Sequence, residues 1–232
     1  MISRREAIKG VALLTGATLL TGTRVAGNSV ESKTQFTYCL NTSTISGQKT
    51  GFLKEFEITA KAGYSGIEIW VRDLQKYVQE GGSLKDLKKY AEDLGLTIEN
   101  AIGFAQWAVD DETTRKTGME QMKREMDMLA QIGCKRIAAP PAGATSLPLL
   151  DLFEVAKRYR KVLELGDQTG VLPQLEFWGA SANLHHISQA LFVASATGHP
   201  KACILPDVYH MFRGGSSYES LKLMSGSSIE MF

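Results

Sequence analysis

Short apolar runs that alternate with amphipathic helical segments predict an α/β protein, a TIM (β/α)8-type barrel. Six helical segments each end at a glycine, the residue best suited to the left-handed position just after a helix. An apolar run follows each glycine, at intervals of roughly 25 to 40 residues, which is about the length of one βα unit. Repeated βα units imply parallel strands with right-handed crossovers, and a long series of them favours a barrel.

The predicted strands number seven, one before the first helix and one after each of the six glycines. They are 36–40, 65–70, 96–101, 136–139, 172–177, 202–207 and 229–232. An open dinucleotide-binding sheet is disfavoured, because residues 41–50 contain one glycine and no G-x-G-x-x-G motif after the first strand.

The helices between the strands each present one apolar face. Ser83 is a good N-cap for a helix whose face is formed by Leu84, Leu87, Ala91 and Leu94. We interpret the stripe of the next helix as core and not as a soft binding surface; it consists of Met119, Met122, Met126 and Leu129. Asn183 is the predicted N-cap of a later helix, and we interpret the adjacent His185 and His186 as surface residues.

The seventh predicted strand reaches Phe232, whereas a barrel of this type has eight strands, typically in about 250 residues. We therefore expect an incomplete barrel with about seven strands, formed by a domain at 33–232 that is truncated at its C-terminal end. A longer reading frame at the same locus would support this expectation.

The N-terminal segment resembles an export signal. Arg4 and Arg5 precede the uncharged, mildly apolar stretch 10–23, a pattern typical of a Tat signal. That stretch is shorter than the roughly 20 residues that a transmembrane helix needs. We expect a Tat-type signal peptide and linker at 1–32 and a periplasmic or otherwise exported protein; the alternative is a cytoplasmic N-terminal helix.

Composition excludes several kinds of partner. A net charge of +1 without a basic stripe gives no support for binding to nucleic acid or to an anionic membrane, while a homo-oligomer stays open. Cys39, Cys134 and Cys203 are odd in number and show no C-x-x-C spacing. We interpret them as small buried hydrophobic residues, and not as a disulfide framework or a zinc site.

Two predicted strands end in acids, Glu176 and Asp207. The active site of a βα barrel lies at the carboxyl ends of its strands, and a carboxylate buried there needs a cation, a hydrogen-bond donor or a metal. Polar and aromatic side chains lie at or near the ends of the strands, and we predict substrate contacts from Glu68, Trp70, Trp107, Trp178, His210 and Arg213. Aromatic faces combined with polar groups are typical of a sugar site.

Each of these residues also has a purely structural interpretation. Glu176 could pair with a cationic side chain inside the barrel, Asp207 could cap a helix, and His210 could be an ordinary loop histidine. Glu68 could be a structural acid, and the three tryptophans could pack at the end of the barrel.

Segments 63–68, 175–176 and 207–210 resemble the sugar phosphate isomerase/epimerase family of xylose isomerase-like barrels. The resemblance covers about 35–232 and implies a divalent metal, often Mn²⁺, with Mg²⁺, Co²⁺ or Zn²⁺ as alternatives. In the family the ligands are Glu, Asp, His and Glu from strands five to eight. Glu176 and Asp207 match the first two, and the other two are expected beyond Phe232.

The same resemblance implies a reaction. Glu176 would be both a metal ligand and the catalytic base that removes a proton next to a carbonyl to give an enediolate, and a second carboxylate would return the proton. His210 would contact a substrate oxygen, and Arg213 an oxyanion or hydroxyl.

We therefore expect the full-length protein to be a metal-dependent isomerase or epimerase of a small sugar. The alternatives are a metal-dependent lyase or hydrolase of oxidised sugars or glycosides, and a sugar-binding barrel without catalysis. The endonuclease branch of the family is disfavoured, because the sequence shows neither additional metal-binding histidines nor a basic groove.

Overall fold

A computed structural model of the chain describes residues 36–232, of which 37–232 form one compact unit. The Tat-type signal predicted for 1–32, and the first residues of the predicted 33–232 domain, lie outside the described residues. Within 36–232, no helix combines the length and the apolar character that crossing a membrane requires.

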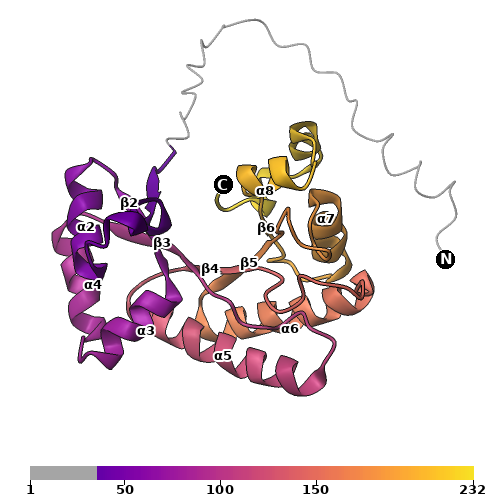
Figure 1. Ribbon diagram of the computed structural model, residues 1–232, viewed down its shortest axis with the longest axis horizontal. Helices are drawn as coiled ribbons and strands as arrows, with labels where there is room; N and C mark the ends of the chain where they lie inside the picture. The colour runs from indigo at the N-terminus through magenta and orange to yellow at the C-terminus, as the bar shows by residue number, and fades with distance from the viewer. Residues whose placement is uncertain (1–35) are drawn as a thin grey trace, which may run out of the picture. The chain divides into compact units, whose positions relative to one another are not determined.

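The described residues form one parallel sheet of six strands in the order in which they occur along the chain. The strands are β1 (Cys39–Asn41), β2 (Gly66–Trp70), β3 (Thr97–Ile102), β4 (Arg136–Ala139), β5 (Leu172–Glu176) and β6 (Ile204–Leu205). Sequential parallel neighbours joined by helices are the arrangement of a TIM barrel, and β1 and β6 are not paired with each other. The predicted fold class, an incomplete (β/α)8 barrel, is therefore confirmed (Figure 1).

The seventh predicted strand is wrong as a strand. In the segment 229–232 only Ile229 pairs with the sheet, through a single parallel bridge to Ile204. The residues before it form a short 3-10 helix, η3 (Gly226–Ser228), which the Ser225 side chain caps. Because this turn brings only one residue into register, the ladder does not extend beyond Ile229.

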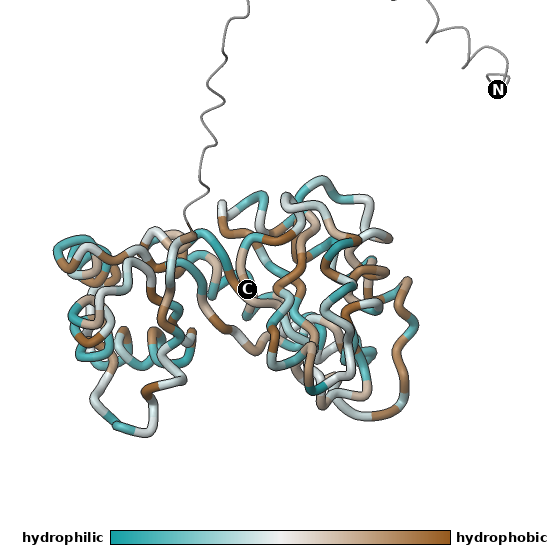
Figure 2. The backbone as a smooth tube through the Cα atoms, turned by 90° about the horizontal axis from the view of Figure 1, so that it is seen from above, coloured by the Kyte–Doolittle hydropathy of each residue, from teal (hydrophilic) through white to brown (hydrophobic). Residues whose placement is uncertain are grey.

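Helices follow the strands and lie along the outside of the sheet (Figure 1). The α-helices are α2 (Phe52–Lys61), α3 (Val71–Gln79), α4 (Leu84–Asp93), α5 (Glu112–Gln131), α6 (Leu152–Thr169), α7 (Ile187–Ala196) and α8 (Val208–Arg213). Two further 3-10 helices are η1 (Thr42–Gln48) and η2 (Tyr218–Leu223). Hydrophilic and hydrophobic residues alternate along the helical coils in Figure 2, as amphipathic helices require.

The helix predictions hold except at the start of α7. Ser83 caps α4 by accepting a hydrogen bond from the backbone of Asp86, and the methionine stripe of α5 packs in the core. The cap of α7 is His186 and not Asn183. Asn183 is buried instead, and its side chain bonds to the backbone of the β4–α6 loop at Leu150, Ala144, Ser146 and Pro148.

Tyr159 of α6 is a fully buried polar anchor between helix and sheet. Its hydroxyl lies 2.8 Å from the carbonyl oxygen of Pro173 in β5 and 2.9 Å from that of Cys203, which precedes β6. The single hydroxyl proton is donated to one of these carbonyls at a time, so Tyr159 holds α6 over the two strands that carry the acids.

We predict that Tyr159→Phe lowers the free energy of unfolding by about 1–3 kcal/mol, because the buried hydrogen bond that the hydroxyl donates to these carbonyls is lost. Urea unfolding followed by circular dichroism measures this change. Tyr38→Phe is the matched control, since Tyr38 is 72% exposed and its change should stay within about 0.5 kcal/mol. Equal losses in the two variants would contradict the anchoring role.

Candidate functional site

Glu176, Asp207 and His210 meet at the carboxyl ends of β5 and β6. Glu176 is the last residue of β5, Asp207 follows β6 as the N-cap of α8, and His210 lies in the first turns of that helix. One potential ligand atom from each of the three lies within 4.8 Å of the others. The two acids that the sequence placed at neighbouring strand ends are therefore brought together, and His210 joins them.

The environment of Glu176 opposes its ionisation. Burial, the largest cause, and the nearby acids Asp207 and Glu68 together raise the pKa of this carboxyl to about 8. Burial also lowers the pKa of His210, although Asp207 opposes that shift. His210 Nε2 lies 3.8 Å from Glu176 Oε1, but because both pKa shifts favour the neutral forms, the two do not form a strong ion pair.

Asp207 and His210 are fixed by backbone groups. Asp207 Oδ1 accepts hydrogen bonds from the backbone N–H groups of Tyr209 at 2.7 Å and of His210 at 3.1 Å. Asp207 therefore caps α8, as its structural interpretation proposed. Both capping hydrogen bonds go to Oδ1, and Oδ2 takes no part in the cap. His210 Nδ1 accepts a hydrogen bond from the backbone N–H of Gly179 at 3.4 Å.

The donor set suits a divalent cation. Glu176 Oε2 is buried and has no hydrogen-bond partner among the described residues. Burying a carboxylate oxygen without a hydrogen-bond partner costs free energy. A cation bound by Glu176 and Asp207 would offset that cost, because its positive charge would compensate the buried negative charge. Carboxylate oxygens are ligands that Zn²⁺ and Mn²⁺ accept, so Glu176 and Asp207 fit the divalent metal that the family resemblance implied.

An aromatic wall stands beside the acids, formed by Trp70, Phe104, Trp178 and the ring of His210. The ring centroids of Trp70 and Phe104 are 5.2 Å apart, those of Phe104 and Trp178 5.8 Å, and those of Trp178 and His210 6.4 Å. The guanidinium of Arg72 lies 4.1 Å from the Trp70 ring centroid. Trp70 and Trp178 thus lie where the sequence placed them, and Phe104 links them.

Of two further predicted contacts, Trp107 lies in the core, whereas Arg213 lies at the end of α8 beside Gly179. Trp107 is fully buried, packs on Tyr159 and donates its indole N–H to the carbonyl of Pro140 at 2.9 Å. Its ring therefore has a packing role, although in the core and not at the end of the barrel that the structural alternative named. Arg213 is exposed at the end of α8, three residues after His210.

Glu68 is held in a layer of amide side chains across the inner face of the sheet. The side-chain amides of Asn41 and Asn100 each donate to one of its carboxylate oxygens, and the Asn100 bond is 2.7 Å long. Gln174 of β5 donates in turn to Asn100 Oδ1 at 3.3 Å, past the small side chain of Ala138 in β4. Burial raises the pKa of Glu68, and the hydrogen bonds from the two amides oppose this shift. The same two bonds hold the Glu68 side chain in one position.

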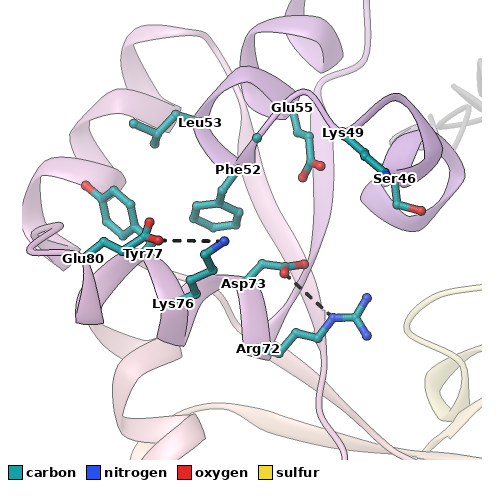
Figure 3. A pocket seen from close by; sticks show the side chains of 11 residues that line it. Ser46, Lys49, Phe52, Leu53, Glu55, Arg72, Asp73, Lys76, Tyr77 and Glu80 are labelled. Carbon is teal, nitrogen blue, oxygen red and sulfur yellow. Dashed lines mark ion pairs between the residues drawn. The ribbon is translucent and has the colours of Figure 1, made fainter.

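A separate pocket of about 480 Å³ lies between η1, α2 and α3 (Figure 3). Phe52 and Tyr77 line it, and so do two ion pairs, Arg72–Asp73 at 3.8 Å and Lys76–Glu80 at 3.8 Å. None of its lining residues was predicted as a site residue, and its ion pairs are already internally balanced. The pocket does not include Glu176, Asp207 or His210, and we assign it no part in the chemistry at Glu176.

Sequence reasoning missed Phe104 and Gln174. Gln174 lies two residues before Glu176 on the same strand, and the period-two alternation of a strand places both on one face, so this signal was available. Phe104 lies two residues beyond the end of β3 in an irregular segment, where periodicity gives no direction to a side chain. Only the packing against Trp70 and Trp178 identifies it.

We predict that the chelated, metal-free protein loses about 1–3 kcal/mol of stability between about pH 5 and pH 8.5, and that Glu176→Gln removes most of this loss. Between its ordinary pKa of 4.5 and the folded value of about 8, the folded chain binds a proton on Glu176 that the unfolded chain has released. Stability must therefore fall as pH rises through this window.

Urea unfolding at the two pH values measures the effect. Glu120→Gln, which removes an exposed acid of α5, should keep the pH dependence of the unmodified chain. The same slope in Glu176→Gln and in the unmodified chain would contradict the prediction.

Comparisons with known proteins identify the family. The chain is 27% identical to the inosose isomerase of Bacillus velezensis over 202 residues, which cover 84% of the chain and 70% of that protein. It is 29% identical over 111 residues, 45% of the chain and 17% of the relative, to the 3-dehydroshikimate dehydratase of Pseudomonas aeruginosa. The fold matches the crystal structure of the IolI protein with a bound zinc atom, with a TM-score of 0.75 and 22% identity over 84% of this chain and 71% of that one. A family model described as xylose isomerase-like TIM barrel matches residues 56–232, and the chain belongs to that family.

Proposed function

We propose that the protein is a metal-dependent sugar isomerase or epimerase, in which Glu176 moves a proton at a carbon next to a carbonyl. The observation that carries this proposal is the unpartnered carboxylate oxygen of Glu176 beside Asp207 and His210. Similarity to an inosose isomerase supports the same reaction class. A metal bound at Glu176 and Asp207 would supply positive charge that polarises a carbonyl and favours the ionised form of Glu176.

The chain's own residues have distinct tasks in this reaction. The ring of a sugar or cyclitol packs its C–H face on Trp70, Phe104 and Trp178, which exclude water from the reacting carbon. Glu176, once ionised, removes the proton from that carbon. His210 Nε2 lies 3.8 Å from Glu176 Oε1, so a substrate oxygen bound beside this pair can accept a hydrogen bond from the imidazole.

Proton removal next to a carbonyl also begins the elimination of water, so a lyase acting on an oxidised sugar or related ring is the second candidate. The specific observation in its favour is the similarity to the 3-dehydroshikimate dehydratase. The two candidates share the same base and the same aromatic wall. They differ in the product, because an isomer keeps the mass of the substrate and an eliminated product loses one water.

The chain should bind about one divalent ion per molecule, and Glu176→Gln should weaken that binding by at least about tenfold. Asp207→Asn should weaken it similarly while preserving α8, because asparagine is as good an N-cap as aspartate. Isothermal titration with Mn²⁺, Mg²⁺, Co²⁺ and Zn²⁺ measures the affinities and ranks the metals.

Glu125→Gln is the matched control for this titration, since it neutralises another buried carboxylate, on α5 and outside the site. Mass spectrometry of products from a panel of ketoses, inososes and keto-glycosides then separates isomerisation from elimination. A protein that binds sugars but no metal would contradict the enzymatic proposal and favour a sugar-binding barrel.

The aromatic wall makes a further prediction. Trp178→Ala should weaken sugar binding by about 1–3 kcal/mol with little change in stability, because it removes a stacking face at the site. Trp107→Phe should instead destabilise the fold by about 1–3 kcal/mol and leave sugar affinity unchanged, because its indole bonds to Pro140 inside the core. Fluorescence titration with sugars and urea unfolding give the two readouts; the reverse pattern would contradict the placement of the wall.

A further inference from the structure

α8, the helix that carries His210, is attached to the rest of the protein by few contacts. It has six residues, and three of its side chains, Val208, Tyr209 and Phe212, are 55%, 59% and 77% exposed. Only Met211 is fully buried in the core. A helix this short and this exposed needs a further constraint if His210 is to keep one orientation toward Glu176.

Gly179 and Gly214 provide that constraint by direct backbone contact. A Cβ placed on Gly179 would lie 2.5 Å from the nitrogen of Gly214 and 2.5 Å from the carbonyl oxygen of His210. A Cβ on Gly214 would lie 2.0 Å from the carbonyl oxygen of His185 and 3.1 Å from the Cα of Gly179. The end of α8 and the loop after β5 therefore touch through two glycines.

Neither glycine is required by its backbone conformation. Gly214 has a φ of −89°, and Gly179 is not among the residues with positive φ. Other residues adopt such φ values readily, so the absence of a side chain matters here for the close approach alone. The backbone at these two positions has no room for a β-carbon.

The same contact delivers a hydrogen bond to His210. The backbone N–H of Gly179 donates to His210 Nδ1 at 3.4 Å. Because a backbone N–H can only donate, Nδ1 must be the unprotonated nitrogen, and a neutral imidazole then carries its proton on Nε2. Nε2 is the nitrogen that faces Glu176 Oε1.

We infer that Gly179 is a positioning residue for His210: its contact with Gly214 seats α8, and its N–H fixes the His210 tautomer that presents an N–H at Nε2. This inference rests on the proposed function for its purpose, a hydrogen-bond donor aimed at a substrate oxygen. It assigns to the glycine after Trp178 a role that its neighbours in the sequence do not reveal. A protonated Nε2 also cannot be a metal ligand, so His210 acts as a donor and the acids bind the metal.

Nitrogen NMR of the full chain tests the tautomer directly. The protein is labelled with ¹⁵N-histidine, treated with chelator and measured near pH 8, and His210 is assigned among the four histidines by its absence in His210→Gln. We expect His210 to show a single tautomer, with Nδ1 unprotonated and Nε2 protonated. A proton on Nδ1, or rapid exchange between both tautomers, would overturn the inference without any variant having to fold.

Gly179→Ala tests whether the contact between Gly179 and Gly214 holds α8 in place. We expect it to lose the single-tautomer signature of His210, and Gly214→Ala to lose it too, because each added methyl group separates α8 from the loop after β5. Gly226→Ala is the matched control, since a Cβ at Gly226 meets nothing within 4 Å and should leave the spectrum unchanged. A folded Gly179→Ala protein with the unmodified His210 signature would refute the role of Gly179.

The NMR samples contain neither metal nor sugar. Their result therefore does not depend on whether the enzymatic proposal is correct. A chain that binds no metal can still show the fixed tautomer. Conversely, an active isomerase whose His210 carries its proton on Nδ1 would disprove the positioning role alone.

Discussion

Burial of the Glu176 carboxylate at the end of β5 is the constraint on which the site depends. An acid at this position is removed from water by the strand and by the wall beside it, and one of its oxygens has no partner among the described residues. Burial and neighbouring acids raise its pKa to about 8. A group held in this state is prepared to accept a cation and to exchange a proton near neutral pH, the two properties that a proton-transfer site requires.

The surrounding elements serve to hold this acid and its neighbours in place. Tyr159 anchors α6 to the backbone at β5 and just before β6, and the amide layer around Glu68 extends from β1 to β5. Asp207 has two tasks, because one oxygen caps α8 and the other stays available at the site. Neighbouring strands that end at one edge of a parallel sheet make this convergence possible.

The sequence by itself determined the strand order and the position of the acids. Two local features carried these predictions: a glycine after each helix, and an apolar run that ends in Glu176 or just before Asp207. Both can be recognised without knowing how the side chains pack. Strand positions were predicted to within a few residues for β1 to β6. The segment after Gly226 failed as a strand because pairing depends on register with β6, which a four-residue pattern cannot specify.

Only the tertiary structure decided which side chains meet. Trp70, Trp107 and Trp178 look alike along the chain, yet Trp107 packs in the core on Tyr159 while the other two join Phe104 beside the acids. The sequence assigns no role to Gly179, and only its contact with Gly214 places it against His210. Such roles depend on the curvature of the sheet and the approach of distant backbones, which no local periodicity encodes.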